Sequence, residues 1–114
     1  MPMLKIVTNT TVAEDNRQAL ATLASSTVAE ILGKPERYVM VSIEENHSML
    51  FGGSDAPLAY LELKSIGLPE SQTSEFSARL ASLLEEQLGL PADRVYIEFA
   101  DAARNMWGWN GGTF

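Results

Sequence analysis

The chain of 114 residues contains no cysteine and a single histidine. The lack of cysteine excludes disulfides, thiolate metal sites and cysteine nucleophiles. Because His47 is the only histidine, one chain cannot form a site that needs two histidine ligands. His47 follows Glu44 and Glu45 in a predicted turn, and we interpret it as a solvated residue rather than a metal ligand. The sequence therefore predicts no metal site.

Positive charge and long apolar runs are also scarce. Eight Lys and Arg residues against fifteen Asp and Glu residues give a net charge of −7. This balance disfavours nucleic acid and anionic membranes as partners, because few cations are available to neutralise their phosphates. No segment approaches the ~20 apolar residues of a membrane span, and the N-terminus lacks the pattern of a signal peptide. We expect a cytoplasmic protein, with export by a non-classical secretion route left open.

The length of the chain predicts one domain, residues 1–114. Its composition, with 46% apolar and 20% charged residues, is that of an ordinary globular protein. Two stretches carry apolar residues at three- and four-residue steps, which is typical of helices. The first helix is expected to begin with a capping box, Thr11 and Glu14, and to end at Gly33. The second covers residues 71–88 and ends at Gly89. The expected core positions are Leu20, Leu23, Ala24, Thr27, Val28, Ile31, Phe76, Leu80, Leu83, Leu84 and Leu88.

Strands are expected at residues 3–8, 38–44, 58–65 and 95–99, where apolar and polar residues alternate. The order β-α-β-β-α-β is accompanied by an internal repeat, because Leu32-Gly33-Lys34-Pro35 is echoed by Leu88-Gly89-Leu90-Pro91. We therefore divide the chain into two related halves, roughly 1–56 and 57–114. Each helix would be the right-handed crossover between two parallel strands. The prediction is an α+β fold of duplicated β-α-β units, a four-stranded mixed sheet with both helices on one face.

The open face of this sheet and the C-terminal tail both predict self-association. The echoed strands place a mixed set of side chains on that face, neither a core nor a charged surface: Tyr38, Met40, Ser42, Arg94, Tyr96 and Glu98. The tail carries Trp107, Trp109 and Phe114, which is too apolar for a free terminus. An oligomer would cover both features.

Pro2 is the candidate catalytic group that the residues themselves offer. Removal of Met1 would leave a secondary amine that leads directly into a predicted buried strand. An α-amine titrates near pH 8, and burial beside a cation lowers its pKa. Such an amine is a usable general base near neutral pH. The alternative, that the Met-Pro start has no catalytic meaning, is left open by the residues alone.

Several short motifs are spread over essentially the whole chain: Met1-Pro2-Met3, Gly33-Lys34-Pro35, Phe51-Gly52-Gly53-Ser54, Ser65-Ile66-Gly67, Asp93-Arg94-Val95-Tyr96-Ile97, and Gly108-Trp109-Asn110 with Thr113-Phe114. In these motifs, in their order and in their spacing, the chain resembles the macrophage migration inhibitory factor family of the tautomerase superfamily. The resemblance implies a homotrimer and a cofactor-free keto–enol tautomerase acting on phenylpyruvate-like acids and dopachrome analogues.

The resemblance also implies a role for each site residue. Pro2 would be the catalytic base, and Lys34 would bind the carboxylate of a small aromatic 2-keto acid and help keep the amine neutral. The backbone at Ile66 would contact the substrate. A neighbouring subunit would contribute Tyr96. The apolar rim would consist of Trp109 and Phe114.

Three positions depart from the family pattern. Its CxxC segment falls on residues 58–61, which lack sulfur, so a thiol-redox activity is excluded. Glu98 replaces an asparagine near the substrate, and its charge would raise the pKa of the base and repel an anionic substrate. Trp107 replaces a valine and would narrow the rim. Two alternatives are a cytokine-like protein-binding module with a vestigial pocket, and a small-ligand-binding domain without catalysis.

Overall fold

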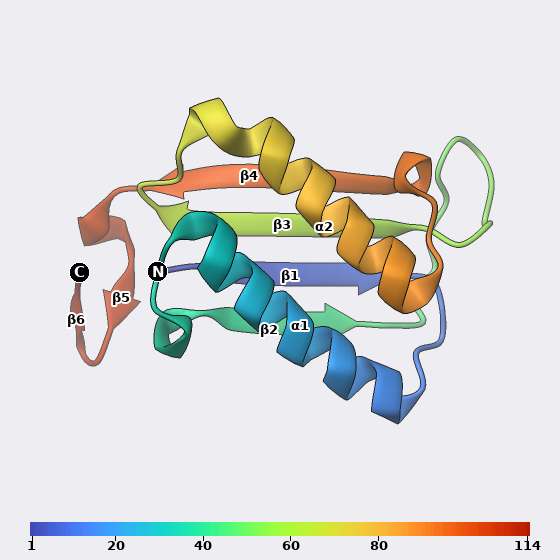
Figure 1. Ribbon diagram of the computed structural model, residues 1–114, viewed down its shortest axis with the longest axis horizontal. Helices are drawn as coiled ribbons and strands as arrows, with labels where there is room; N and C mark the ends of the chain where they lie inside the picture. Colours follow the sequence, from blue (N-terminus) through green and yellow to red (C-terminus); the bar gives the residue numbers. More distant parts are fainter.

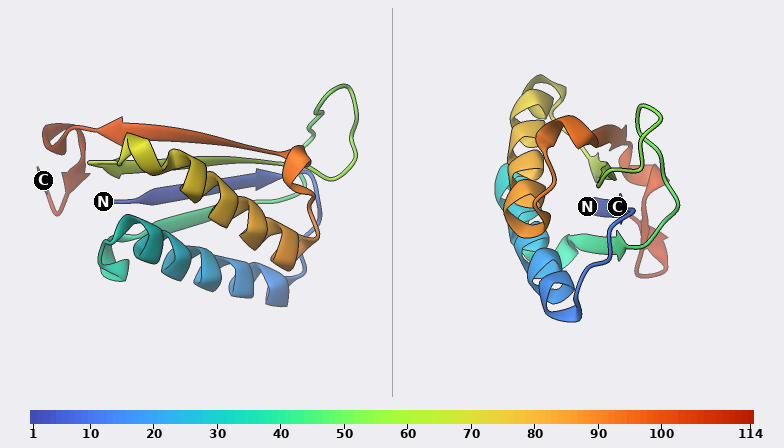
Figure 2. Two further views of the ribbon diagram at one scale, coloured as in Figure 1. Left: turned by 45° about the horizontal axis from the view of Figure 1, so that its top comes forward. Right: turned by 90° about the vertical axis from the view of Figure 1, so that its right-hand side faces the viewer.

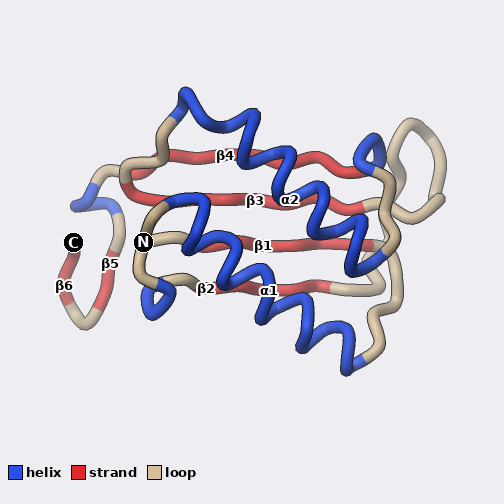
Figure 3. Tube along the Cα trace, in the orientation of Figure 1, coloured by secondary structure: helices blue, strands red, loops and turns tan.

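The computed structural model describes residues 1–114 as a four-stranded sheet with two helices on one face (Figures 1 and 3). The main elements are β1 (Met3–Thr8), α1 (Glu14–Leu32), β2 (Met40–Glu44), β3 (Ala59–Ile66), α2 (Thr73–Leu88) and β4 (Val95–Ala102). The strand order is β2-β1-β3-β4. β1 pairs with β2 and β3 pairs with β4 in parallel, whereas β1 and β3 are antiparallel. The predicted α+β fold with two β-α-β units is confirmed.

The hydrophobic core lies between this sheet and the helices. β1 and β3 contribute their inward-facing positions, and each helix contributes a stripe with i, i+4 spacing. The most deeply buried side chains are Leu4, Ile6, Leu61, Leu63, Leu20, Val28, Phe76, Leu80 and Leu84. Leu23 was expected in the core but is 41% exposed, because the buried stripe of α1 runs through Leu20, Ala24 and Val28 and leaves Leu23 on its outer side. Neither helix combines the length and apolar character that a membrane crossing requires.

The start of α1 differs from the prediction. The helix begins at Glu14, and no side chain caps it, so the expected capping box is wrong. The hydroxyl of Thr11 instead donates to Asn46 Oδ1 at 2.6 Å, and the Val12 N–H donates to the Glu45 carboxylate at 2.6 Å. A loop that follows β2 therefore supplies the hydrogen-bond acceptors that the capping box was expected to provide locally.

Other boundaries shift where short 3₁₀ turns replace the expected regular structure. Glu36–Tyr38 form such a turn, so β2 begins at Met40 rather than at Tyr38. Glu70–Gln72 form another one immediately before α2. At the same end of the sheet β4 is longer than expected, because it continues to Ala102, which pairs with Ile66.

The C-terminal tail forms a small hairpin beyond the end of the sheet at which β1 begins (Figures 1 and 2). After a 3₁₀ turn at Arg104–Met106, β5 (Gly108–Trp109) pairs with β6 (Gly112–Thr113). Asn110 and Gly111 have φ of 52° and 78°, the left-handed conformation that a two-residue hairpin turn requires. The hairpin thus brings the tail next to the N-terminus.

Thr8, at the end of β1, offers a stability test. Its fully buried hydroxyl donates to the Leu58 carbonyl at 2.7 Å and accepts from the Thr10 N–H at 3.2 Å. Thr8→Val keeps the shape but leaves both backbone groups without this partner, so we expect a loss of about 1–2 kcal/mol in the free energy of unfolding. Urea unfolding measures it. Thr22→Val, at an exposed hydroxyl of α1, is the control, and equal losses in the two variants would contradict the account.

Candidate active site

Pro2 lies immediately before β1, at the end of the sheet that the tail approaches. Its side chain is fully buried. Its carbonyl accepts a hydrogen bond from the Met40 N–H at 3.0 Å, which continues the ladder between β1 and β2 by one step. The burial of the ring and the hydrogen bond to the carbonyl both restrict the movement of Pro2. The sheet therefore fixes the position of the Pro2 nitrogen.

Next to Pro2 is a cavity of about 320 Å³ with a mainly apolar lining. Four segments of the chain form its wall: residues 1–3, residues 37–40, residues 107–109 and Phe114. The cavity therefore exists only because the tail hairpin folds back over the start of β1. An apolar cavity with a few polar groups is the usual form of a small-molecule site.

Aromatic rings form one side of this cavity. Trp109 and Phe114 stack with their ring centroids 5.4 Å apart, and Tyr38 meets them edge-on at 5.7 and 6.0 Å. Trp107 also lines the cavity. The sequence predicts that this tryptophan, in place of the family's valine, narrows the rim of the pocket. Trp109 is 54% exposed, so this aromatic wall retains surface for an apolar ligand.

Lys34 stands on the β3 side of Pro2. Gly33, with φ of 62°, ends α1 in the left-handed conformation, which turns the chain towards the sheet. The half-buried Lys34 side chain then donates through Nζ to the Ile66 carbonyl at 2.5 Å. The backbone of Ile66 thus holds the lysine in place.

Two arginines join Lys34 at this end of the molecule. Arg37 lines the cavity, with its guanidinium carbon 4.7 Å from the centroid of the Tyr38 ring. Arg104 donates through Nε to the backbone oxygen of Phe114 at 3.1 Å. Burial, together with the charges of Lys34 and Arg104, lowers the pKa of the Met1 α-amine. The surroundings of the N-terminus therefore favour an uncharged amine.

Tyr96 and Glu98 do not reach this cavity within one chain. Tyr96 lies opposite Tyr60 in the register, and Tyr60 lies opposite Val7, five residues along the strand from Pro2. At about 3.3 Å per residue this is a separation of roughly 17 Å along the sheet. Tyr96 is 65% exposed, and its ring packs 4.5 Å from that of Phe51.

The Glu98 carboxylate is held on the open face of the sheet. It accepts a hydrogen bond from the Tyr60 hydroxyl at 3.1 Å, and Glu62 lies 3.2 Å from the same hydroxyl. Burial, followed by the hydrogen bond to Glu98 and the charge of Glu62, raises the pKa of Tyr60 to about 12. The phenol therefore stays protonated and can keep donating to these carboxylates.

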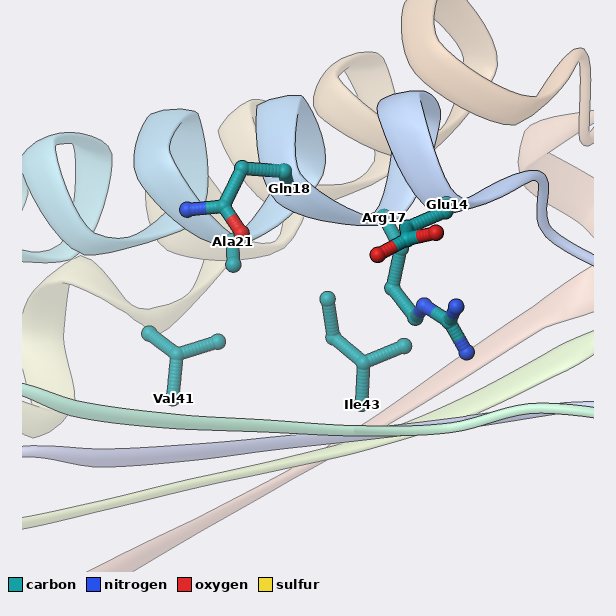
Figure 4. A pocket seen from close by; sticks show the side chains of 6 residues that line it. All are labelled: Glu14, Arg17, Gln18, Ala21, Val41 and Ile43. Carbon is teal, nitrogen blue, oxygen red and sulfur yellow. The ribbon is translucent and has the colours of Figure 1, made fainter.

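A second cavity, of about 310 Å³, lies between α1 and the edge strand β2 (Figure 4). Val41 and Ile43 point from the strand towards Gln18 and Ala21 of the helix. The ion pair between Arg17 and Glu45 lies at one end of this gap. None of its lining residues belongs to the predicted site, so the cavity beside Pro2 is the candidate active site.

Of the predicted site residues, Pro2, Trp109 and Phe114 line the cavity. Lys34, bonded to the Ile66 carbonyl, lies outside the lining but close enough to the N-terminus to act on the pKa of the Met1 amine. Tyr96 and Glu98 lie elsewhere. Sequence reasoning missed Arg37, Tyr38 and Arg104. Arg37 and Tyr38 directly follow the Gly33-Lys34-Pro35 motif, and that proximity was the available signal. Tyr38 was expected on the open sheet face; this is wrong, because a 3₁₀ turn directs it onto the tail. Arg104 has no local signal, because only the folded tail places it.

Known proteins share both the sequence and this architecture. The family model described as "Macrophage migration inhibitory factor (MIF)" matches residues 1–114. The macrophage migration inhibitory factor homolog of Trichinella spiralis is 38% identical over 115 residues, covering 100% of both chains. The crystal structure of a homologue from Prochlorococcus marinus superposes with a TM-score of 0.93 at 43% identity, covering 98% of each chain. The chain belongs to the macrophage migration inhibitory factor family, within the tautomerase superfamily.

Proposed function

We propose that this protein is a keto–enol tautomerase for small aromatic 2-keto acids of the phenylpyruvate type, with the Pro2 amine as its general base and no cofactor. One observation carries the proposal. The fully buried Pro2 adjoins an aromatic-walled cavity, beside cations that lower the pKa of the neighbouring amine. Membership of the tautomerase superfamily supports the same reaction class. The cytoplasmic location stays a prediction from the sequence.

The proton transfer requires a free Pro2 amine, so Met1 must be removed. Once it is removed, the burial, Lys34 and Arg104 that lower the pKa of the Met1 amine would act on the amine one residue further along. A lower pKa means that more of the amine is neutral at pH 7 and able to accept a proton. The surroundings of Pro2 therefore suit a base rather than an acid.

The reaction moves one proton within the substrate. The neutral Pro2 nitrogen removes it from the carbon next to the carbonyl, the electron pair of the broken C–H bond forms the C=C bond, and the carbonyl electrons pass to oxygen. The protonated amine then returns a proton on the oxygen side, which gives the enol and regenerates the base. Lys34 holds the carboxylate, and the wall of Tyr38, Trp109 and Phe114 accepts the aromatic ring.

We also propose that the active form is a homotrimer in which a neighbouring subunit's Tyr96 and Glu98 face this cavity. Within one chain Tyr96 lies towards the far end of the sheet and Glu98 lies near its middle, opposite Glu62, although the family resemblance assigns both to the site. Exposed apolar side chains gather around Tyr96, which is 65% exposed and lines one hollow together with Leu50, which is 71% exposed. A second copy would cover this surface and complete the cavity wall.

Glu98→Gln tests that arrangement. If a neighbour's carboxylate faces the cavity, its removal lowers the pKa of the base and the repulsion of an anionic substrate. We expect kcat/KM for phenylpyruvate to rise about twofold to fivefold at low salt, with the ascending limb of the pH profile moved to lower pH. Steady-state kinetics measures both effects.

The matched control is Glu86→Gln, an exposed carboxylate on α2, which should change neither quantity. Analytical ultracentrifugation confirms that both variants keep the assembly of the parent protein. An unchanged pH profile in Glu98→Gln, or a monomer with full activity, would contradict the shared site.

The direct assay follows the enol of phenylpyruvate by its ultraviolet absorbance, on protein whose intact mass shows that Met1 is absent. Turnover that saturates with substrate supports the proposal. A correctly processed protein with no turnover would reject it. That result would leave the two non-catalytic readings, a protein-binding module and a small-ligand-binding domain, to be separated by binding experiments.

A further inference from the structure

The tail hairpin that completes the aromatic wall is not part of the main sheet. β5 and β6 form a two-stranded sheet of their own and pair over two residues in each strand. A hairpin of this length has little stability by itself in water. Its rings contact the body of the molecule, where Tyr38 meets both Trp109 and Phe114 edge-on. The position of the wall over the cavity therefore depends on what else holds the tail.

Phe114 needs an attachment of its own, because it lies one residue beyond β6. Its N–H donates to the Trp107 carbonyl at 3.2 Å, and its oxygen accepts from Arg104 Nε at 3.1 Å. Phe114 is the last residue of the chain, so this oxygen belongs to a carboxylate, and its hydrogen bond with the guanidinium is charge-assisted. The two bonds hold the Phe114 backbone on both sides of the carbon that carries the ring.

Arg104 is itself attached to the main sheet. It begins the 3₁₀ turn that follows β4, and Ala103 alone separates it from the last residue of that strand. The Trp107 N–H donates to the Arg104 carbonyl at 3.3 Å, which stabilises this turn. The bond between the Arg104 side chain and Phe114 joins residues ten positions apart. It therefore closes the tail into a loop whose base is the end of β4.

We propose, on the basis of the function proposed above, that Arg104 is a positioning residue that gives the cavity its selectivity for aromatic substrates. It acts through Phe114, whose ring stacks on Trp109 with the centroids 5.4 Å apart and lines the cavity. Without the bond to Arg104, the last residue is free to leave the wall, and an aromatic substrate loses one of the rings against which it would pack. An aliphatic 2-keto acid makes no ring–ring contact, so its binding depends less on Phe114.

The test compares phenylpyruvate with 4-methyl-2-oxopentanoate, an aliphatic acid with the same carboxylate and keto group. ¹H NMR follows the exchange of deuterium into the carbon next to the carbonyl of each substrate. For Arg104→Met, we expect the ratio of the two kcat/KM values to fall about threefold to tenfold, mainly because KM for phenylpyruvate rises. Arg104→Lys keeps a charged donor and should retain most of the ratio. An unchanged ratio in Arg104→Met would overturn the inference.

A double variant tests whether Arg104 acts through the ring of Phe114. Phe114→Leu should lower the ratio by a similar factor, and the addition of Arg104→Met should then lower it little further, because both changes remove the same contact. If the two effects multiply instead, Arg104 acts elsewhere and the inference is wrong.

The pH profile distinguishes the charge of Arg104 from its hold on the tail. That charge lowers the pKa of the N-terminal amine, so Arg104→Met should move the ascending limb of kcat/KM to higher pH for both substrates. Phe114→Leu, which keeps the charge, should leave the limb in place. Arg79→Met, at an exposed arginine of α2 that pairs with Glu30, is the control and should change neither the ratio nor the profile.

A binding measurement separates this inference from the proposed tautomerase function. Isothermal titration calorimetry compares 3-phenylpropanoate with 4-methylpentanoate, which are the two substrates without their keto groups. If phenylpyruvate is turned over and Arg104→Met keeps the preference for it, the inference is wrong and the tautomerase stands. If neither keto acid is turned over, the tautomerase fails, and binding decides the inference: a preference for 3-phenylpropanoate that Arg104→Met loses supports it, and an unchanged preference overturns it.

Discussion

Pro2→Gly should lower kcat for phenylpyruvate enolisation by about 100-fold or more, the lower end of what a positioned general base contributes. Glycine also permits removal of Met1, so the variant still presents an α-amine. That amine is primary and lacks the ring that is buried against the sheet, so it is no longer held at the cavity. Steady-state kinetics on protein of verified intact mass measures the effect.

Pro91→Gly is the matched control. Pro91 occupies the repeated position before a 3₁₀ turn, and it is exposed and outside the cavity. We expect it to cost about 0.4–1 kcal/mol in stability, through greater freedom of the unfolded chain, and to leave kcat unchanged. Equal activity of Pro2→Gly and the parent protein would remove Pro2 from the mechanism.

Lys34→Met should lower kcat/KM for phenylpyruvate by about 10- to 100-fold, because a charge-assisted hydrogen bond to the substrate carboxylate is lost. It should also change the pH dependence. Lys34 lowers the pKa of the N-terminal amine, so its removal raises that pKa, and a higher pH is then needed to form the neutral base. The ascending limb of kcat/KM against pH should therefore move to higher pH.

Lys5→Met is the control for this prediction. Lys5 lies in β1 on the open face of the sheet, where it pairs with Glu44 at 3.4 Å. We expect its kcat/KM to change less than twofold and its pH profile to keep its position. A Lys34→Met variant with a normal profile and a raised KM would show that the lysine binds the carboxylate without tuning the base.

Most of the fold could be predicted because each helix and strand is determined by residues that are close together in the sequence. The alternation in β3 and the i, i+4 stripe of α2 each depend on a few neighbouring residues, and Gly33 and Gly89 end both helices in the left-handed conformation. The capping box at Thr11 failed because a residue more than thirty positions away, Glu45, supplies the acceptor. Such a contact is a property of the assembled fold.

The site was less predictable for the same reason. Pro2 and Lys34 stand in short motifs that could be recognised, whereas the position of Arg104 depends on how the tail hairpin folds over β1. Tyr96 was expected at the site through its family motif, yet within one chain it lies towards the far end of the sheet from Pro2. In the proposed trimer a second subunit would bring it to the cavity. Local patterns indicate the proposed base and the proposed carboxylate-binding lysine, and tertiary structure decides which other charges surround them.

The measurement that tests the central claim most directly is a pH titration of the Pro2 nitrogen by ¹⁵N NMR, in protein labelled at proline. The account predicts an amine signal that titrates with a pKa below the ordinary α-amino value of about 8, so that a larger fraction of the amine is neutral at pH 7 than in an ordinary N-terminus. An amide signal at this position, or an amine that remains protonated above pH 8, would contradict a general base at Pro2.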